Sequence, residues 1–152
     1  MTGSLLASLG MYGASLAIAL IAGVFPLASL EVFLVGLSAI KHPSVGQLAI
    51  CCLLGAFGHQ VAKTITYFAG EGALENEKMK PRIEKLRVRI AKWDRYPHGI
   101  LFLAATVGLP PMYLIGFIAH PLMNIRFWRF TLLTFVGRVG RYMFLAVIPL
   151  LF

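Results

Sequence analysis

The sequence predicts an all-α integral membrane protein with about three full transmembrane helices, two opposed re-entrant hairpins and one cytoplasmic amphipathic helix. Composition is the first observation behind this prediction: 59% of the 152 residues are apolar and 13% are charged, whereas soluble domains carry about 25% charged residues. The mean hydropathy of +0.80 agrees with it. The second observation is that the apolar residues fall into four blocks, roughly 5–40, 44–70, 98–122 and 126–152. Such blocks are typical of a chain whose solvent is the bilayer.

The lengths of the blocks indicate which segments cross the bilayer. Residues 44–70 reach about 40 Å as a helix, enough to cross a hydrocarbon core of about 30 Å, and the last block is equally long. Residues 5–40 are too many for one crossing and too few for two crossings with a turn, and Pro26 interrupts them. We therefore expect a span over about 5–24, a hairpin turn at Pro26 and a shorter helix after it.

The third block contains two adjacent prolines, Pro110 and Pro111, near its middle. Each half of the block has about a dozen residues and reaches about 18 Å, so neither half crosses the bilayer alone. Two half-helices joined by a turn at these prolines predict a re-entrant hairpin. Such a hairpin is tolerated at membrane depth where its broken backbone is buried in protein or lines a watery cavity. One proline-kinked span is the alternative.

The distribution of charge predicts the orientation. Of the 14 basic residues, 8 lie between Lys78 and Arg95, and the formal net charge is +8. Acidic residues lie within and just before this stretch, so a membrane surface fits it better than a nucleic acid does. The positive-inside rule places this linker, residues 71–97, and the N-terminus in the cytoplasm. Residues 1–10 lack the basic segment of a signal peptide, so we expect the N-terminus to be retained.

The two hairpins enter the membrane from opposite faces in this topology, which is the layout of an inverted repeat. A weak internal match supports it, since His42-Pro43 recurs 78 positions later as His120-Pro121. We therefore expect a single membrane domain over residues 1–152. Its parts are a first half over about 5–70, the amphipathic linker 71–97 and a second half over about 98–152.

The linker has a helical pattern of its own. Apolar residues recur at spacings of four and three, which places them on one stripe of a helix: Met79, Ile83, Leu86, Ile90 and Trp93. Basic residues lie on the other faces, and Pro81 suits the first turn. The pattern predicts an amphipathic helix. It fits a helix lying on an anionic cytoplasmic leaflet, and equally a helix packed against the protein's own cytoplasmic side.

Ionisable residues inside the predicted spans are candidate functional residues, because a charge at the centre of a membrane helix costs about 2.5 to 3.5 kcal/mol. A polar stripe with spacings of three and four runs along the last block: Thr131, Thr134, Arg138 and Arg141. The block 44–70 carries His59 and Lys63 at the same kind of spacing. The two stripes predict a hydrated cationic path that binds an anion through Arg138, Arg141 and Lys63. The alternative for Lys63 is that its amine extends to the lipid headgroups.

Glu31 is the only acidic residue in the four apolar blocks, and it lies on the first hairpin. It is predicted to pair with one of the buried bases or to carry a proton. His59 is a second candidate for these roles, although a membrane histidine also serves as a hydrogen-bond partner between helices. One acid does not neutralise three bases, so the surplus positive charge predicts that an anion visits the site.

The sequence shows no machinery of an enzyme. The four histidines have no i, i+4 pairing with each other, so we expect no metal site. No Ser-His-acid, CxxC, phosphate-loop or GxSxG arrangement is present, so we expect neither catalysis nor a cofactor. Cys51 and Cys52 are adjacent in an apolar run and are expected to be reduced packing residues.

Each half of the chain contains a group of short motifs. In the first half these are Phe25-Pro26 with Ser29-Leu30-Glu31 and Gly36, then Leu54-Gly55-Ala56-Phe57-Gly58 leading to Tyr67, Gly70 and Gly72. In the second half they are Gly108-Leu109-Pro110-Pro111, Gly116, Phe130 and Gly137-Arg138-Val139-Gly140-Arg141-Tyr142. Together these motifs resemble the DedA, or VTT (SNARE-associated Golgi), membrane proteins, and those of the second half look most like the small YqaA-type branch. The resemblance covers roughly residues 24–148.

The resemblance implies a protein of the cell inner (plasma) membrane with two opposed re-entrant hairpins, in a superfamily linked to lipid scrambling and to flipping of polyprenyl-phosphate carriers. Glu31 would occupy the hairpin acid of the family. The family's usual Gly-Asp step reads Gly58-His59 here, and the arginine that usually flanks the proline of the second hairpin is missing. These departures argue against proton-driven flipping as in the DedA proteins proper. They indicate that Arg138 and Arg141 supply the positive charge instead.

Two functional hypotheses of different classes follow. The leading hypothesis is a transporter, flippase or scramblase of an anionic lipid or lipid-phosphate carrier, whose headgroup the three bases bind by charge-assisted contacts. The alternative is a non-transporting membrane subunit of a larger complex, or a small-molecule exporter. The expected partners are membrane lipids with anionic headgroups and a second copy of the chain or another membrane protein, and no nucleic acid.

Overall fold

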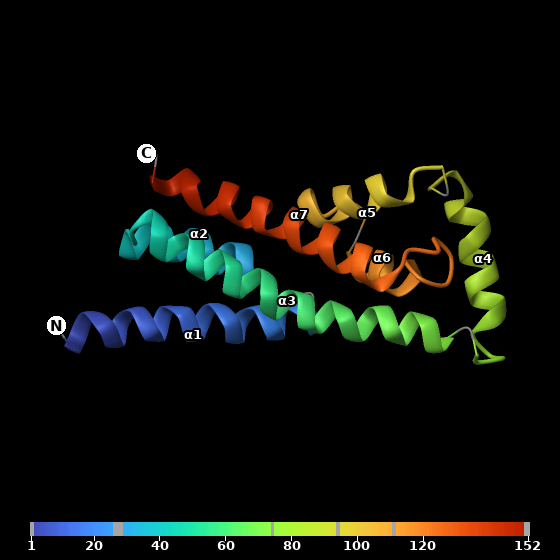
Figure 1. The fold of residues 1–152 in the computed structure, drawn as a ribbon, viewed down its shortest axis with the longest axis horizontal. Coiled ribbons are helices and arrows are strands. Elements are labelled where there is room, and N and C mark those ends of the chain that lie inside the picture. Colours follow the sequence, from blue (N-terminus) through green and yellow to red (C-terminus); the bar gives the residue numbers. More distant parts are fainter. Residues whose placement is uncertain (1, 26–28, 74, 94, 111, 151–152) are drawn as a thin grey trace. The chain divides into compact units, whose positions relative to one another are not determined.

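A computed structural model describes residues 2–25, 29–73, 75–93, 95–110 and 112–150, and every regular element over these residues is a helix (Figure 1). The α-helices in chain order are α1 (Thr2–Val24), α2 (Leu30–Lys41), α3 (Val45–Ala73), α4 (Lys80–Ile90), α5 (Pro97–Thr106), α6 (Met112–Ile118) and α7 (Phe127–Val147). Two short 3-10 helices follow α4 and α7, namely η1 (Ala91–Trp93) and η2 (Ile148–Leu150). The prediction of an all-α fold is confirmed.

Two of the described helices are long and apolar enough to cross a membrane. They are α3, with 29 residues, and α7 together with η2, with 24 residues. As an ideal helix, α3 extends about 44 Å. The segment Leu9–Val24 of α1 and the helix α5 are apolar but shorter. Of the three full spans that the sequence predicts, two therefore meet this criterion of length and composition.

Local side-chain hydrogen bonds explain where α2 and α3 begin. Ser29 caps α2, since its Oγ accepts a hydrogen bond from the Val32 N–H at 3.3 Å. The helix ends where His42 takes a left-handed conformation with φ of 44°. Ser44 and Gln47 then form a reciprocal capping box. The Gln47 N–H donates to Ser44 Oγ at 3.3 Å, and the Ser44 N–H donates to Gln47 Oε1 at 3.0 Å.

The third apolar block divides into two short helices. α5 has 10 residues and α6 has 7, and the two helices contact each other. In the turn between them Gly108 has φ of 88°, a conformation that suits a residue without a Cβ. The chain is therefore broken here and does not form one proline-kinked helix. Pro110 lies in this break, whereas Pro111 and Pro26, the other predicted hairpin turns, lie outside the described residues.

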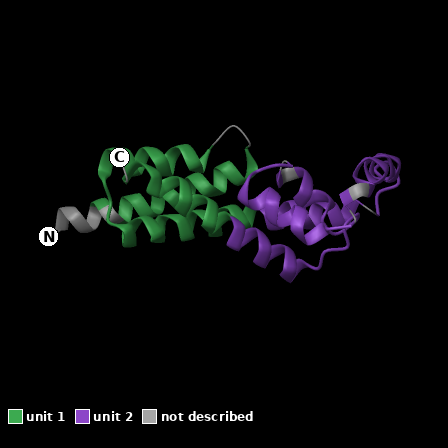
Figure 2. Ribbon diagram, turned by 90° about the horizontal axis from the view of Figure 1, so that it is seen from above, with its two compact units in different colours: residues 1–62, 138–152 green, residues 63–137 purple. Residues whose placement is uncertain are grey.

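The chain groups into two compact units, which Figure 2 shows in different colours. Unit 1 comprises residues 1–62 and 138–152, and unit 2 comprises residues 63–137. The boundaries between the units fall within α3 and α7, so each of these long helices contributes to both units. Each unit therefore contains residues from both of the predicted halves, 5–70 and 98–152, and unit 2 also contains the linker 71–97.

Glycines of α3 allow close contact between helices in unit 1. A Cβ on Gly58 would lie 2.9 Å from the Cβ of Ala19, so α3 approaches α1 more closely than an alanine would permit. One turn earlier, a Cβ on Gly55 would lie 2.6 Å from Leu30 Cδ2 of α2. Small residues at helix crossings are typical of membrane proteins, in which backbones pack closely. This packing holds the segment of α3 that carries His59 against α1 and α2.

Unit 2 has an apolar core to which five helices contribute. One buried residue from each is Tyr67 of α3, Ile90 of α4, Leu101 of α5, Ile115 of α6 and Phe130 of α7. The Tyr67 hydroxyl donates to the carbonyl oxygen of Ile125 at 2.8 Å, so this large side chain is buried without an unpaired hydroxyl.

The core of unit 2 also determines which way α4 faces. Ile83 is 5% exposed and Ile90 is 4% exposed, although both belong to the apolar stripe that the sequence predicts for the linker. The apolar face of α4 is therefore turned toward the protein. Of the two alternatives for this amphipathic helix, packing of its apolar stripe against the protein itself is the one observed.

Candidate functional site

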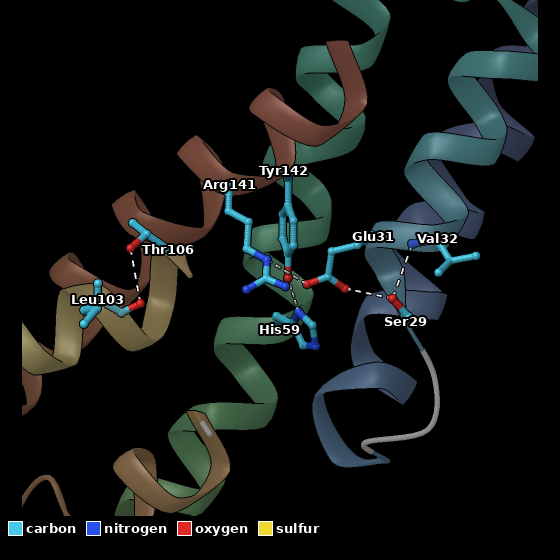
Figure 3. Close-up of polar contacts among 8 residues, drawn as sticks. All are labelled: Ser29, Glu31, Val32, His59, Leu103, Thr106, Arg141 and Tyr142. Carbon is cyan, nitrogen blue, oxygen red and sulfur yellow. Dashed lines mark hydrogen bonds and ion pairs between the residues drawn. The ribbon is translucent and has the colours of Figure 1, made fainter. Parts of the chain in front are cut away.

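Glu31, on the first turn of α2, forms an ion pair with Arg141 of α7 in unit 1 (Figure 3). Glu31 Oε1 lies 3.2 Å from Arg141 Nε, and the two side chains are 24% and 26% exposed. The Nε has no partner with the angles of a hydrogen bond among the described residues, so charge holds this contact. The structure thus brings together two predicted site residues that are far apart in the sequence.

Ser29 and the start of α2 support the carboxylate of Glu31. The Ser29 Oγ donates to Glu31 Oε2 at 3.0 Å while it accepts from the Val32 N–H. The N-terminus of a helix carries a partial positive charge, which stabilises a carboxylate on its first turn. One oxygen of Glu31 therefore has a hydrogen bond and the other has an arginine. The sequence places Ser29 at the start of an apolar helix, which is the signal of a cap, but that signal does not reveal its bond to Glu31.

Arg138 lies one helical turn before Arg141 and is a buried cation. The residue is 5% exposed, and its Nη1 has no hydrogen-bond partner among the described residues. Glu31, Arg141 and Tyr142 are close enough to interact with it electrostatically. The acid of this group, Glu31, is already paired with Arg141. Two arginines and one glutamate give the cluster a formal charge of +1 when all three are ionised.

His59 of α3 and Tyr142 of α7 form a second polar contact in unit 1 (Figure 3). His59 Nδ1 is hydrogen-bonded to the Tyr142 hydroxyl, and the two rings are stacked with centroids 6.0 Å apart and an interplanar angle of 25°. Tyr142 is 1% exposed, so its hydroxyl needs a partner within the protein. His59 therefore serves as a hydrogen-bond partner between helices, which is one of the roles that the sequence leaves open for it.

The buried face of α7 follows a four-residue repeat. Each of its members is at most 5% exposed: Phe130, Thr134, Arg138, Tyr142 and Ala146. Residues four apart share one side of a helix, because a turn has 3.6 residues. Tyr142 is not among the site residues that the sequence predicts for this helix. The repeat through Arg138 is the signal that could have found it.

Lys63 and the threonines of α7 belong to unit 2. Lys63 is 7% exposed and has an interaction partner in the structure. It is therefore a buried base and not a side chain spread over the surface. Thr134 is fully buried, and its Oγ1 donates to the carbonyl oxygen of Phe130 at 2.7 Å. The cluster of Glu31, Arg138 and Arg141 belongs to unit 1, whereas Lys63 belongs to unit 2.

Within the described parts of the chain, no three His, Cys, Asp or Glu side chains gather as metal ligands. Cys51 and Cys52 are buried free thiols in unit 1. In unit 2, His120 Nε2 lies 4.0 Å from Glu71 Oε1.

The chemistry of the cluster in unit 1 is that of an oxyanion site. Guanidinium groups donate strong, charge-assisted hydrogen bonds to phosphate or carboxylate oxygens. The Glu31–Arg141 pair is about a quarter exposed, whereas Arg138 is buried, so the cluster is accessible from the side of the pair. An anion that reaches Arg141 would compete with Glu31 for it.

Comparison of the chain with protein-family models, with curated proteins and with solved structures gives no match.

Proposed function

We propose that this chain is a multi-pass protein of the cell inner membrane that moves an anionic lipid or lipid-phosphate carrier across the bilayer, as a transporter, flippase or scramblase. The observation that carries the proposal is the state of Arg138. Its guanidinium is buried, its Nη1 has no hydrogen bond within the described residues, and the neighbouring acid is already paired. A buried charged donor without a partner is costly. A ligand oxyanion that binds there would remove this cost.

Several features support a membrane setting. α3 and α7 are long and apolar enough to cross a bilayer. Large apolar side chains remain exposed on both helices, among them Phe57, Ile65 and Phe144 at 57%, 65% and 71%. Contact of these side chains with lipid tails has no free-energy cost, whereas their contact with water is unfavourable. α5 and α6 are too short to cross a core of about 30 Å, as a re-entrant hairpin requires.

The geometry suggests an order of contacts for the headgroup. An oxyanion first meets the partly exposed Arg141 and displaces Glu31, whose carboxylate keeps its hydrogen bond to Ser29. The headgroup then accepts hydrogen bonds from Arg138, one turn deeper in the buried face of α7. Glu31 re-forms its pair with Arg141 when the headgroup leaves. In this scheme Glu31 limits the affinity of the arginines, which allows the lipid to be released.

The resemblance to DedA proteins is consistent with this proposal at the positions that form the cluster. Glu31 matches the family's hairpin acid, and Arg138 and Arg141 lie in the Gly137–Tyr142 motif. The predicted topology places the N-terminus and the linker 71–97 in the cytoplasm.

Lipid movement in liposomes tests the proposal. The purified full-length chain is reconstituted, and the rate at which a fluorescent anionic phospholipid becomes accessible to an external quencher is measured. We expect Arg138→Gln and Arg141→Gln each to slow this rate at least tenfold, because each removes a charge-assisted contact of about 1.5 to 3 kcal/mol.

A matched control separates the site from net charge. Arg126→Gln removes the same charge at an exposed position just before α7 and should leave the rate unchanged. Equal rates for the wild type and an Arg138→Ala, Arg141→Ala double variant would overturn the assigned roles. Protein-free liposomes set the background.

The same observation favours one second candidate, a non-transporting membrane subunit. An acid from a partner protein could satisfy Arg138 as well as a lipid phosphate could. Copurification in mild detergent distinguishes the two: a stoichiometric partner with an intramembrane Asp or Glu, lost in Arg138→Gln, would favour the subunit. Lipid movement by the purified chain alone would favour the transporter.

A further inference from the structure

The outer face of α4 is strongly basic. Over Lys80–Ile90 the exposed ionisable side chains are Lys80, Arg82, Glu84, Lys85, Arg87 and Arg89. Five bases and one acid give this helix a formal charge of +4. Ile83 and Ile90 of its apolar stripe are already buried in the protein, so a partner of α4 meets its charged face.

The ion pairs that Lys80 and Arg87 form are weak, so both bases remain available to an anion. Lys80 pairs with Glu77, and Arg87 Nη1 lies 3.7 Å from Glu84 Oε2. The four side chains are between 52% and 83% exposed. Ion pairs in such positions contribute only about 0 to 1 kcal/mol, because water screens them. An incoming anion can therefore replace either acid at little cost.

A groove lies beside the same bases. Its volume is about 490 Å³, and it is lined by Lys80, Pro81, Ile83, Glu84, Arg87, Pro121 and Leu122. The bases at its rim are Lys80 and Arg87, which are seven residues apart and so share one face of α4. Its apolar walls come from α4 and from the segment after α6. Such a groove suits a ligand that carries an anionic group next to an apolar part.

Unit 2 contains two cation–aromatic pairs with exposed rings. The Arg95 guanidinium lies 5.7 Å from the ring centroid of Tyr96, just before α5, and Arg129 lies 5.2 Å from that of Trp128, at the start of α7. Tyr96 is 65% exposed and Trp128 is 58% exposed. Exposed Tyr and Trp beside basic residues are typical of the membrane–water interface. α4 ends at Ile90, five residues before Arg95 in the sequence, so the headgroup region is the setting that suits it.

We infer that the basic face of α4, with its groove, is a docking surface for anionic phospholipid headgroups at the membrane surface. The contact is electrostatic and not insertional, because the apolar stripe that an interfacial helix normally buries in lipid is buried here in protein. The inference rests on the membrane placement in the proposed function but not on transport. Its site shares no residue with the cluster of Glu31, Arg138 and Arg141.

Titration with short-chain lipids tests this surface directly. A fluorophore is attached to a Val88→Cys variant of the full-length chain in non-ionic detergent. Val88 is 76% exposed, whereas Cys51 and Cys52 are 0% exposed, so the label reports on α4. The probes are dihexanoyl phosphatidylglycerol, dihexanoyl phosphatidylcholine and inorganic phosphate. We expect phosphatidylglycerol to bind at least fivefold more tightly than phosphatidylcholine, with an affinity that falls as salt rises.

Matched variants define the residues. Lys80→Gln and Arg87→Gln should each weaken binding of phosphatidylglycerol about fivefold, as expected for one charge near a lipid surface. Glu84→Gln should strengthen it, and Lys41→Gln, an exposed base of α2, should not change it. Far-UV circular dichroism checks that each variant is folded, and the opposite sign of Glu84→Gln distinguishes lost charge from lost structure.

Some results of the titration would overturn the inference that α4 docks anionic phospholipids. Equal binding of the two lipids, or weaker binding in both Arg87→Gln and Glu84→Gln, would overturn it. Inorganic phosphate that binds as tightly as phosphatidylglycerol would show a plain phosphate site and overturn the docking of lipid. The transport proposal is tested by lipid movement in liposomes and this surface by the fluorophore on α4, so a failure of the transport proposal does not affect this result.

Discussion

Three neighbouring groups stabilise the carboxylate of Glu31. Ser29 donates to one of its oxygens, Arg141 pairs with the other, and the start of α2 adds a favourable dipole. The carboxylate in turn is the acid that offsets the charges of Arg138 and Arg141, so the cluster depends on it.

We expect Glu31→Gln to lower the free energy of unfolding by about 2 to 3 kcal/mol, because it leaves both arginines without an acid. This loss of stability is smaller than that for a fully buried ion pair, since the side chains of Glu31 and Arg141 are about a quarter exposed. Chemical denaturation of the purified protein in detergent measures it. Glu84→Gln, which breaks an exposed pair, should change stability by less than about 1 kcal/mol. A similar loss in both variants would contradict the special role of Glu31.

The helices pack in unit 1 through small residues, and Gly58 of α3 is not equivalent to Gly140 of α7. A Cβ on Gly58 would meet Ala19 at 2.9 Å and the backbone oxygen of Leu16 at 3.0 Å. A Cβ on Gly140 would meet nothing within 4 Å. The contrast arises because α3 approaches α1 at Gly58, whereas the side of α7 at Gly140 is open.

Gly58→Ala should therefore destabilise the protein by about 1 to 3 kcal/mol, since a backbone atom in the way cannot move aside as a side chain can. Gly140→Ala should be neutral or stabilise by up to about 1 kcal/mol, the usual gain in helix propensity. Thermal unfolding in one detergent compares the two variants. A loss at Gly140 equal to that at Gly58 would show that this face of α7 is covered, for example by a second copy of the chain.

On the scale of the whole molecule, α3 and α7 connect the two units. The two units differ in what they bury. Unit 1 contains the charged cluster, and unit 2 contains the apolar core around Tyr67 and Phe130. The basic linker belongs to unit 2 through Ile83 and Ile90 of α4. The site and the basic surface are thus built on different units of the chain.

The proposed topology predicts which parts of the chain a membrane-impermeant thiol reagent reaches. A single Val88→Cys variant should be labelled only from the cytoplasmic side, because the positive-inside rule places the linker there. The wild-type chain should not react, since Cys51 and Cys52 are buried. Labelling of intact cells and of opened cells, followed by gel shift, measures this. Labelling of Val88→Cys in intact cells would reverse the predicted orientation.

Much of the secondary structure is predictable from local signals. Apolar blocks, prolines and the stripe in the linker predict the helices and the break between α5 and α6, because these features depend on residues close in sequence. The ends of the helices differ from the predicted blocks by a few residues. The predicted blocks do not show which side chains cap the helices, for example Ser44 and Gln47 at the start of α3.

The sequence alone determined that the chain is helical and apolar, and that a few ionisable residues lie in its apolar blocks, since composition and periodicity are local properties. Which of those residues meet was decided only by the tertiary structure. The packing of α2 and α3 with α7 pairs Glu31 with Arg141 and His59 with Tyr142. It also buries Arg138 without a partner for its Nη1 among the described residues. Helical spacing fixes the face on which a side chain lies, but the crossing of helices fixes what that face contacts.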